Sequence, residues 1–230
     1  MTTTTTDLWY HYGRSRAQRD RAVPESFHWI WSQDAGPGAE VLGDLSGRVV
    51  GDLGAGAARH AAHLATHHMP ARVVAVDASP AQCVMATELY GHIVPRLHIV
   101  QSDVVPHLHM MADTYDVLYS VFGAVDFTDP CDLLPAAAVA LRPGGRLVFS
   151  SLGHYLNGAP AQPDVVPAEV TARTPDGEAT TMHRWVLQEQ VWTKALDEYG
   201  FTRISVDVLP AMAEGPHTAD TLLVTAVRRP

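Results

Sequence analysis

The sequence predicts an α/β protein with a Rossmann-like, doubly wound sheet that is mostly parallel. Three observations lead to this prediction. Strand-like and helix-like segments alternate five times between residues 48 and 152, a glycine-rich turn follows the first of these strands, and two strand-like segments close the chain without a helix between them. Such alternation is typical of βαβ units, whose parallel strands are covered by helices on both faces. We expect seven strands, the final one antiparallel.

The expected strands of the alternation are short apolar runs bounded by turn residues. They lie at residues 48–53, 72–77, 97–101, 115–121 and 146–152. Helices are expected between them at residues 57–68, 80–90 and 130–141. Ser79 and Asp129 are each followed by proline, and this pairing is typical of an N-cap and a first helical residue. Two short helices are expected before the first strand, at residues 14–22 and 37–42.

The tail of the chain has a different pattern. Residues 169–174 and 178–185 flank the turn Pro175-Asp176-Gly177 and predict a hairpin. Residues 187–199 have apolar side chains at helical spacing, and Gly200 ends the predicted helix. Because no helix separates residues 201–209 from 221–227, these two strands should pair antiparallel.

Length and composition restrict the class of protein. The 230 residues suit one domain, and the formal net charge of −9 argues against nucleic acid or an anionic membrane as a partner. We find no apolar run that could span a bilayer and no signal-peptide pattern. Cys83 and Cys131 lie far apart and fit reduced thiols. We therefore expect a cytoplasmic monomer or homodimer without nucleic-acid or membrane partners.

We divide the chain into two parts. Residues 1–46 are rich in aromatic side chains and are expected to form an N-terminal helical lid segment. Residues 47–230 are expected to form the cofactor-binding domain. Within it, residues 153–185 are a long insertion that is free to cover a substrate, because loops of this length in compact domains are usually functional or disordered.

The glycine-rich turn carries the first functional prediction. It reads G-D-L-G-A-G at residues 51–56 and joins a buried strand to a helix. Missing side chains let a ligand approach the backbone, and a helix N-terminus offers free N–H donors. Asp77 ends the next strand, 21 residues after Gly56, where a carboxylate can accept both hydroxyls of a ribose. The pattern predicts a cofactor that contains adenosine.

The same residues favour one adenosine cofactor over another. A dinucleotide site requires a small third residue where helix and strand pack, but this chain has Arg59 there. Asp52, two residues before Gly54, would repel a pyrophosphate. It suits a ligand with a positive amino group instead.

Five motifs in this order resemble the class I S-adenosylmethionine-dependent methyltransferases of the small-molecule type. They are the turn at 51–56, Val76-Asp77, the segment 101–104, the strand at 115–120 and the turn at 141–147. The resemblance implies S-adenosyl-L-methionine as cofactor and Asp103 as the acid near its adenine. The cofactor contacts that it implies are Asp52, Gly54, Ala55, Gly56, Asp77, Ala78, Ser102, Asp103, Val104 and Ser120.

The chain departs from the family pattern at two positions. It has Ala58 where the family often has a third glycine, and Gly51 where the family often has a larger residue. We expect Ala58 to affect cofactor affinity rather than cofactor identity.

The segment after the fourth strand points to the acceptor. It reads Ser120-Val121-Phe122-Gly123 and lacks the Asn/Asp-Pro-Pro-Tyr/Phe motif of enzymes that methylate a base amine or a glutamine amide. A small organic acceptor is the better interpretation, in a setting compatible with natural-product biosynthesis. The site that binds this acceptor is expected to have aromatic walls, formed by Tyr10, Tyr12, Trp29, Trp31 and Phe122. The alternative is that the N-terminal aromatic residues only attach this segment to the core.

The expected reaction is in-line transfer of methyl to an O, N or C nucleophile (EC 2.1.1.-), helped mainly by orientation and exclusion of water. A general base would assist transfer to a hydroxyl acceptor, and for this role we name His154 first, then His183 and Tyr155. The alternatives are a protein of this fold that catalyses a non-methylating reaction, such as a cyclase, and a binding module.

Two further groups of polar residues have simpler interpretations. His60, His63 and His67 share a helix face, but without the pattern of a zinc protease we expect no metal. We expect Asp126, Asp129 and Asp132 to serve loop solvation and a helix cap. His107 and His109 are expected in a loop.

Overall fold

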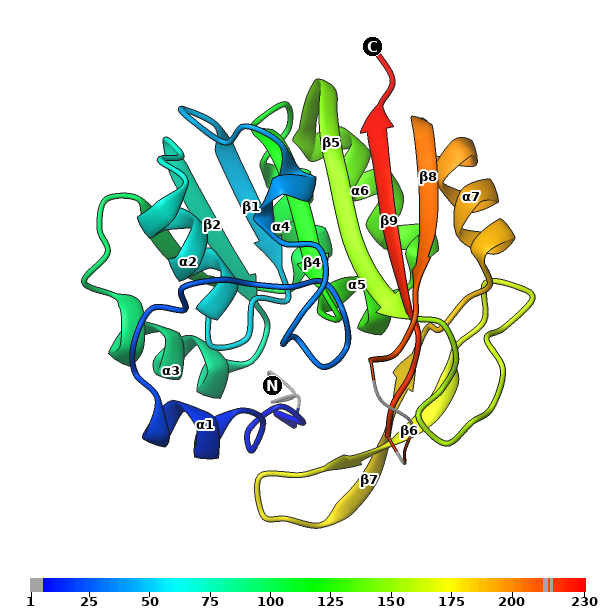
Figure 1. The fold of residues 1–230 in the computed structure, drawn as a ribbon, viewed down its shortest axis with the longest axis horizontal. Coiled ribbons are helices and arrows are strands. Elements are labelled where there is room, and N and C mark those ends of the chain that lie inside the picture. Colours follow the sequence, from blue (N-terminus) through cyan, green and yellow to red (C-terminus); the bar gives the residue numbers. More distant parts are fainter. Residues whose placement is uncertain (1–5, 213–214, 216) are drawn as a thin grey trace, which may run out of the picture.

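A computed structural model describes residues 6–212, 215 and 217–230, so the first five residues of the expected N-terminal segment lie outside the described part. Its main feature is a seven-stranded sheet (Figure 1). The strands are β1 (Val49–Leu53), β2 (Arg72–Asp77), β3 (Leu97–Gln101), β4 (Tyr115–Val121), β5 (Leu141–Leu152), β8 (Phe201–Leu209) and β9 (Thr221–Arg228).

The strand order is β3-β2-β1-β4-β5-β9-β8. Neighbouring strands from β3 to β5 are parallel, and β9 is antiparallel to both β5 and β8. The expected fold, a mostly parallel seven-stranded sheet with an antiparallel final strand, is therefore confirmed.

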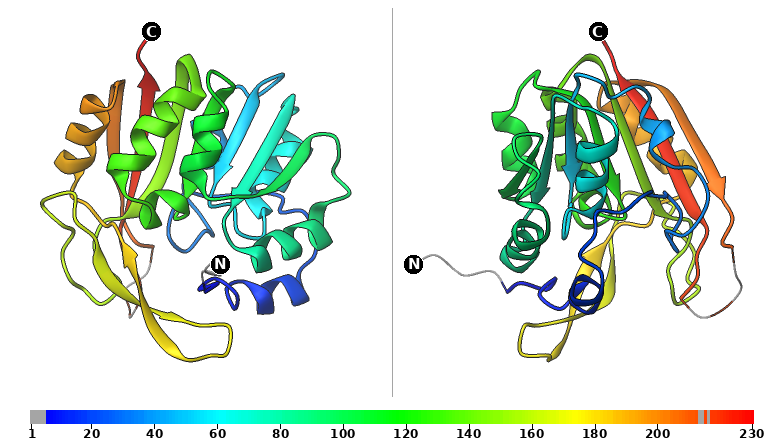
Figure 2. Two further views of the ribbon diagram at one scale, coloured as in Figure 1. Left: turned by 180° about the vertical axis from the view of Figure 1, so that it is seen from behind. Right: turned by 60° about the vertical axis from the view of Figure 1, so that its left-hand side comes forward.

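Helices cover both faces of the sheet (Figure 2). They are α2 (Arg59–His67), α3 (Pro80–Tyr90), α4 (Val104–Met110), α5 (Ala124–Phe127), α6 (Pro130–Ala140) and α7 (Glu189–Glu198). Successive strand residues point to opposite faces, so Val73 and Ala75 belong to the core on the side of α2 and α3, whereas Val74 and Val76 belong to the core on the side of α4, α6 and α7. No helix in the described parts of the chain is long and apolar enough to cross a membrane.

The helix α4 corrects one expectation. His107 and His109 lie in this helix and not in a loop. Pro106 obscures it in the sequence, but proline is tolerated in the first turn, where its missing N–H has no partner to lose. His107 is buried, and its Nε2 lies 2.7 Å from the hydroxyl of Tyr115.

The strand β5 is also longer than expected. It begins at Leu141, directly after α6, and Leu141 pairs with Tyr115. The next pair of this ladder is Arg146 with Val117, so residues 142–145 form a bulge inside the strand. The expected turn at Pro143-Gly144-Gly145 is this bulge.

Two segments lie outside the sheet, at the edge where the parallel strands end (Figure 1). One is the start of the N-terminal segment, which contains α1 (Arg14–Arg19) beside α3, whereas the later 3-10 helix η1 (Ala39–Leu42) lies against β5 and away from this edge. The other is a separate antiparallel hairpin of β6 (Ala168–Arg173) and β7 (Ala179–Arg184). They meet where Nε2 of His11 lies 3.0 Å from the carbonyl oxygen of Pro175 at the hairpin turn.

Candidate functional site: a cavity at the carboxyl ends of the parallel strands

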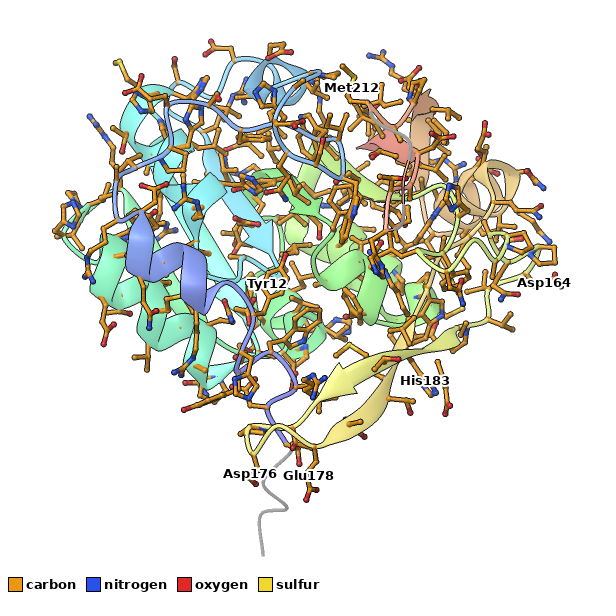
Figure 3. All side chains as sticks on the ribbon, turned by 60° about the horizontal axis from the view of Figure 1, so that its bottom comes forward. Tyr12, Asp164, Asp176, Glu178, His183 and Met212 are labelled. Atoms are coloured by element: carbon orange, nitrogen blue, oxygen red, sulfur yellow. The ribbon has the colours of Figure 1, made fainter. Side chains whose placement is uncertain are left out.

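A cavity of about 1300 Å³ opens at this edge of the sheet. Its walls come from the glycine turn after β1, the ends of β2 and β4, the N-terminal segment and the β6–β7 hairpin. Figure 3 looks towards this edge, with Tyr12 near the middle of the view and His183 out on the hairpin. Ligand cavities for one small molecule usually measure about 300–1,000 Å³. The cavity therefore has room for a cofactor and a second small molecule.

Asp52 lies at the end of β1 with its side chain almost fully buried. The hydroxyl of Tyr119 donates a hydrogen bond of 2.8 Å to its Oδ2. Burial raises the pKa of Asp52 to about 7, although this hydrogen bond acts in the opposite direction, and the nearby Asp77 raises it further. A cationic group bound beside Asp52 would favour its ionised form.

Asp77 holds the glycine turn in place. Its Oδ2 accepts the N–H of Gly56 at 2.7 Å, and its Oδ1 accepts the N–H of Ser79 at 2.9 Å. Burial raises the pKa of this carboxyl, and the two backbone donors oppose the rise. A carboxylate can accept about four hydrogen bonds, so Asp77 retains capacity for ribose hydroxyls.

The two glycines of the turn have different roles. A Cβ on Gly54 would lie 2.2 Å from the amide nitrogen of Ala124, so the backbone packing of the next turn requires glycine there. Gly56 has a φ of +53°, and the atom nearest to a Cβ added there would be Oε1 of Gln82, at 3.5 Å. Gly56 lines the cavity and leaves the backbone open to a ligand.

An unpaired acceptor lies beside this turn. Gln82 donates from Nε2 to the carbonyl oxygens of Trp9 and Tyr12, at 2.8 and 2.9 Å. Its Oε1 is buried and has no hydrogen-bond partner among the described residues. Buried polar groups without partners are uncommon. An open acceptor beside Gly56 and Asp77 fits a ligand that carries hydroxyl or amino donors, as an adenosyl amino acid does.

The two departures from the family pattern have local explanations. Ala58 has a φ of +57°, a left-handed conformation that glycine adopts without strain, which explains why a glycine is common there. A Cβ on Gly51 would lie 2.5 Å from Cδ2 of Leu118 and 3.0 Å from Cε1 of Tyr115. Leu118 and Tyr115 thus leave little room for a side chain at position 51.

Most of the expected cofactor contacts line the cavity, but two do not. Those that do are Asp52, Gly54, Ala55, Gly56, Asp77, Ala78, Asp103 and Val104. Ser102 and Ser120 lie outside this lining. Ser120 is fully buried, and its hydroxyl donates to the carbonyl oxygen of Leu53 at 2.7 Å. The hydroxyl of Ser102 donates to the carbonyl oxygen of Asp103 at 2.9 Å. Both serine hydroxyls are thus engaged with backbone carbonyl groups beside the cavity.

Only some of the aromatic residues expected to form the walls line the cavity. Tyr12, Trp31 and Phe122 line the cavity, and the rings of Trp31 and Phe122 pack edge to face with centroids 5.0 Å apart. Phe122 has a φ of +48° at the end of β4. Such strained backbone is often found at functional sites.

Trp29 and Tyr10 do not belong to these walls. Trp29 is fully buried and packs on Phe27, and its indole N–H donates to the carbonyl oxygen of Gly38 at 2.8 Å. It attaches the N-terminal segment to the core, as the alternative interpretation predicted. Tyr10 lies in a smaller groove outside the cavity, where the guanidinium of Arg14 stacks on its ring at 3.9 Å.

The structure places two of the three expected general bases away from the cavity lining. His183 is exposed on the outer side of β7, because the alternation of a strand turns Met182 and Arg184 inward (Figure 3). Nδ1 of His154 lies 3.0 Å from the carbonyl oxygen of Tyr155. Tyr155 does line the cavity, but its hydroxyl donates to the carbonyl oxygen of Arg184 at 3.2 Å.

Sequence reasoning missed the pair formed by Asp126 and Arg184. Asp126 is fully buried, and its Oδ2 accepts Nη2 of Arg184 at 2.6 Å and Nε at 3.1 Å, so it does not serve loop solvation. Asp129, in contrast, caps α6 as expected and accepts the N–H of Cys131 at 2.8 Å. The sequence offers one signal for Arg184. It lies two residues after Met182 on an expected strand, so both side chains should point to the same face.

The histidines of α2 are engaged within the protein. Nδ1 of His63 lies 2.8 Å from the carbonyl oxygen of Pro24, and its Nε2 lies 3.2 Å from Nε2 of His68. Within the described ranges, no group of three or more His, Cys, Asp or Glu side chains is arranged to hold a metal ion.

The N-terminal segment closes one side of the cavity. Asp7 accepts the hydroxyl of Ser79 at 2.8 Å and the N–H of Ala81 at 3.2 Å, at the start of α3. Trp9 packs edge to face on Phe127 with centroids 4.7 Å apart. These contacts join the segment to the start of α3 and to α5.

Comparisons with known proteins agree with this geometry. Residues 50–145 match the family model described as a methyltransferase domain. None of the curated protein sequences matches the chain. Among solved structures, an S-adenosylmethionine-dependent methyltransferase from Mesorhizobium loti is similar, with 21% identity and a TM-score of 0.58 over 82% of this chain and 94% of that chain.

Two other similar structures were solved with ligands. A 1,6-didemethyltoxoflavin-N1-methyltransferase from Burkholderia thailandensis, with its namesake compound and S-adenosylhomocysteine bound, has 20% identity and a TM-score of 0.55, over 80% of this chain and 72% of that chain. Phosphoethanolamine N-methyltransferase 2 from Haemonchus contortus, with S-adenosyl-L-methionine, has 14% identity and a TM-score of 0.61, over 83% of this chain and 51% of that chain.

Residues 50–145 thus match a methyltransferase domain, and the chain is similar in fold to S-adenosylmethionine-dependent methyltransferases, as the resemblance implied. The domain and its structural neighbours support S-adenosylmethionine as the cofactor.

Proposed function

We propose that the protein transfers the methyl group of S-adenosylmethionine to an O, N or C nucleophile of a small organic molecule. The observation that carries this proposal is the cavity, which has an acidic half at the glycine turn and an aromatic half beyond β4. A cofactor occupies the first half and an acceptor the second. Within this proposal the protein acts in the cytoplasm on a metabolite of natural-product biosynthesis, the setting expected from its sequence.

The acidic half would hold the cofactor through three strand-end carboxylates. Asp77 would accept the ribose hydroxyls, Asp103 would contact the adenine amino group, and Asp52 would face the amino group of the methionine part. The bound cofactor supplies an electrophilic methyl group on a sulfonium. Its adenosyl and amino acid parts match the acceptors Asp77, Asp52 and Gln82 Oε1 around the turn.

The aromatic half would orient the acceptor and exclude water. Phe122 and Trp31 provide rigid faces against which a planar molecule can pack. We propose that residues 1–46 and 153–185 act as lids, which is supported by the contacts of Asp7 with α3 and of His11 with the hairpin turn. Orientation and water exclusion can supply most of the acceleration of a methyl transfer.

The test is turnover with a mixed panel of small phenols, amines and organic acids. The purified full chain is incubated with S-adenosylmethionine, and each acceptor is examined by mass spectrometry for a gain of one methyl group together with S-adenosylhomocysteine. We expect at least one methylated acceptor, and its loss in Asp77→Ala. Tight cofactor binding with no methylated product across the panel would contradict the proposal and favour a binding module, and product formation with the cofactor intact would favour a cyclase.

A further inference from the structure

Arg184 is the only lysine or arginine among the buried side chains of the described residues. It ends β7 of the hairpin and lines the aromatic half of the cavity. The other arginine of the lining, Arg59, is paired with Asp20 at 2.8 Å. A buried guanidinium therefore faces the place where an acceptor would lie.

The position of this guanidinium is fixed before any ligand binds. Asp126 Oδ2 accepts both Nε and Nη2 of Arg184, and the N–H of Trp185 donates to the carbonyl oxygen of Asp126 at 2.7 Å. The hydroxyl of Tyr155 holds the carbonyl oxygen of Arg184 from the other side. Such preorganisation lowers the cost of binding a ligand.

Two aromatic rings flank the same guanidinium. Its Cζ lies 5.5 Å from the ring centroid of Trp31 and 5.1 Å from that of Phe127. These rings keep water away from the guanidinium, and hydrogen bonds to a charged donor are stronger in such surroundings.

The guanidinium keeps donors free for a ligand. A guanidinium has five N–H groups. In Arg184 the N–H of Nε and one N–H of Nη2 donate to the same oxygen, Oδ2 of Asp126. Nη1 makes no hydrogen bond with any residue that the structure describes. An arginine that served only to close the hairpin would be expected to satisfy its donors within the protein. The second N–H of Nη2 and one N–H of Nη1 remain free and run parallel, so they match the two oxygens of a carboxylate.

We propose that Arg184 binds a carboxylate group of the acceptor, so that the substrate is a small aromatic organic acid. This inference rests on the proposed function, because it identifies the aromatic half of the cavity as the acceptor site. The rings of Trp31 and Phe122 receive the planar part of the acid, and Asp126 acts as the positioning residue for Arg184.

The experiment compares two probes of the same shape. Binding of 4-hydroxybenzoate and of its neutral amide, 4-hydroxybenzamide, is measured by calorimetry on the full chain, with and without saturating S-adenosylhomocysteine. We expect the acid to bind at least tenfold more tightly than the amide. In Arg184→Gln the acid should lose at least tenfold in affinity, while the affinities for the amide and for S-adenosylhomocysteine stay unchanged.

Two further variants keep the test interpretable. Arg184→Gln leaves Asp126 buried without its partner and can impair folding. The double variant Arg184→Met with Asp126→Leu removes both charges and should fold, and it should also lose the preference for the acid. Arg173→Gln removes an exposed arginine of the same hairpin and should keep the preference.

The proposal is overturned if acid and amide bind equally, if neither binds, or if Arg184→Gln retains the preference. Failure of the proposed function is recognised separately. In that case wild-type protein would not bind S-adenosylhomocysteine, or would bind it without methylating any member of the panel, whatever the two probes do.

Discussion

Tyr119 and Asp52 are cross-strand partners on β4 and β1, and the tyrosine hydroxyl donates to Asp52 Oδ2 at 2.8 Å. Both side chains are buried. Burial and the neighbouring carboxyl raise the pKa of Tyr119 well above its usual range, so the hydroxyl stays a donor. The sheet thus holds a buried carboxyl group with a pKa of about 7 in the lining of the cavity.

The first prediction concerns stability. The pKa of Asp52 is about 7 in the folded chain and 3.8 for an ordinary aspartate, so the folded state holds its proton more tightly than the unfolded state. The free energy of unfolding therefore falls as pH rises from 3.8 to 7. Asp52→Asn removes this pH dependence. The free energy of unfolding of the variant minus that of wild type should therefore be about 2–3 kcal/mol larger at pH 8 than at pH 5.

Urea denaturation at the two pH values measures this difference. Asp164→Asn, at an exposed site, is the matched control and should behave as wild type. An equal effect of Asp52→Asn at both pH values would show that Asp52 is ionised throughout.

The second prediction concerns cofactor affinity. If the ionised form of Asp52 faces the amino group of the cofactor, binding must remove a proton from Asp52 below pH 7. The affinity for S-adenosylhomocysteine should then decrease up to about tenfold per pH unit below 7. Calorimetry at pH 5.5 to 8 measures the slope. Asp52→Asn should bind weakly and without that slope, and an unchanged slope in the variant would assign the proton to another group.

The third prediction separates steric from conformational effects at glycine. Gly54 and Gly47 have similar φ values, +76° and +69°, but only at Gly54 would a Cβ meet other atoms. Gly47→Ala should cost about 1–2 kcal/mol of unfolding free energy, from the left-handed conformation alone. Gly54→Ala should cost about 1–3 kcal/mol more, from the clash with Ala124. Thermal denaturation compares the two variants. Equal costs would show that the turn after β4 shifts to accommodate the added Cβ.

The fourth prediction concerns acid sensitivity. Burial lowers the pKa of both His63 and His68 below 6.5, and each also repels the positive charge of neighbouring histidines. As the pH falls, these two histidines are therefore protonated at a higher pH in the unfolded chain than in the folded chain. The free energy of unfolding falls as pH drops below 6.5. His63→Gln should lose less stability between pH 7 and pH 5 than wild type. His92→Gln, at an exposed site, should lose as much as wild type, and the same loss in all three proteins would contradict the prediction.

The grouping of carboxylates in the acidic half of the cavity could be predicted from the sequence because these residues are local to three strand ends. Asp52, Asp77 and Asp103 each lie at or just after the end of a different strand, and parallel strands bring such ends together. The α/β alternation fixed the order of the elements in the same way. The bulge in β5 and the proline of α4 changed boundaries but not this arrangement.

The acceptor half could not be predicted to the same extent. Trp29 and Trp31 lie two residues apart in an irregular segment, where no periodicity distinguishes a core position from a cavity wall. Arg184 and Asp126 are 58 residues apart, and their pairing depends on how the hairpin folds back over α5. The sequence positions of His154 and His183 favour a general base near the cavity, but the orientations of these side chains depend on loop geometry and on the phase of β7.

The central claim is that the turn at 51–56 and Asp77 hold an adenosyl amino acid and not a dinucleotide. Calorimetric titration of the full chain with S-adenosylhomocysteine, and separately with NADH, tests it most directly. We expect saturable binding of S-adenosylhomocysteine, at least a tenfold loss of affinity in Asp77→Ala that retains the wild-type fold, and no saturable binding of NADH. Saturation by NADH that S-adenosylhomocysteine cannot displace would contradict the claim.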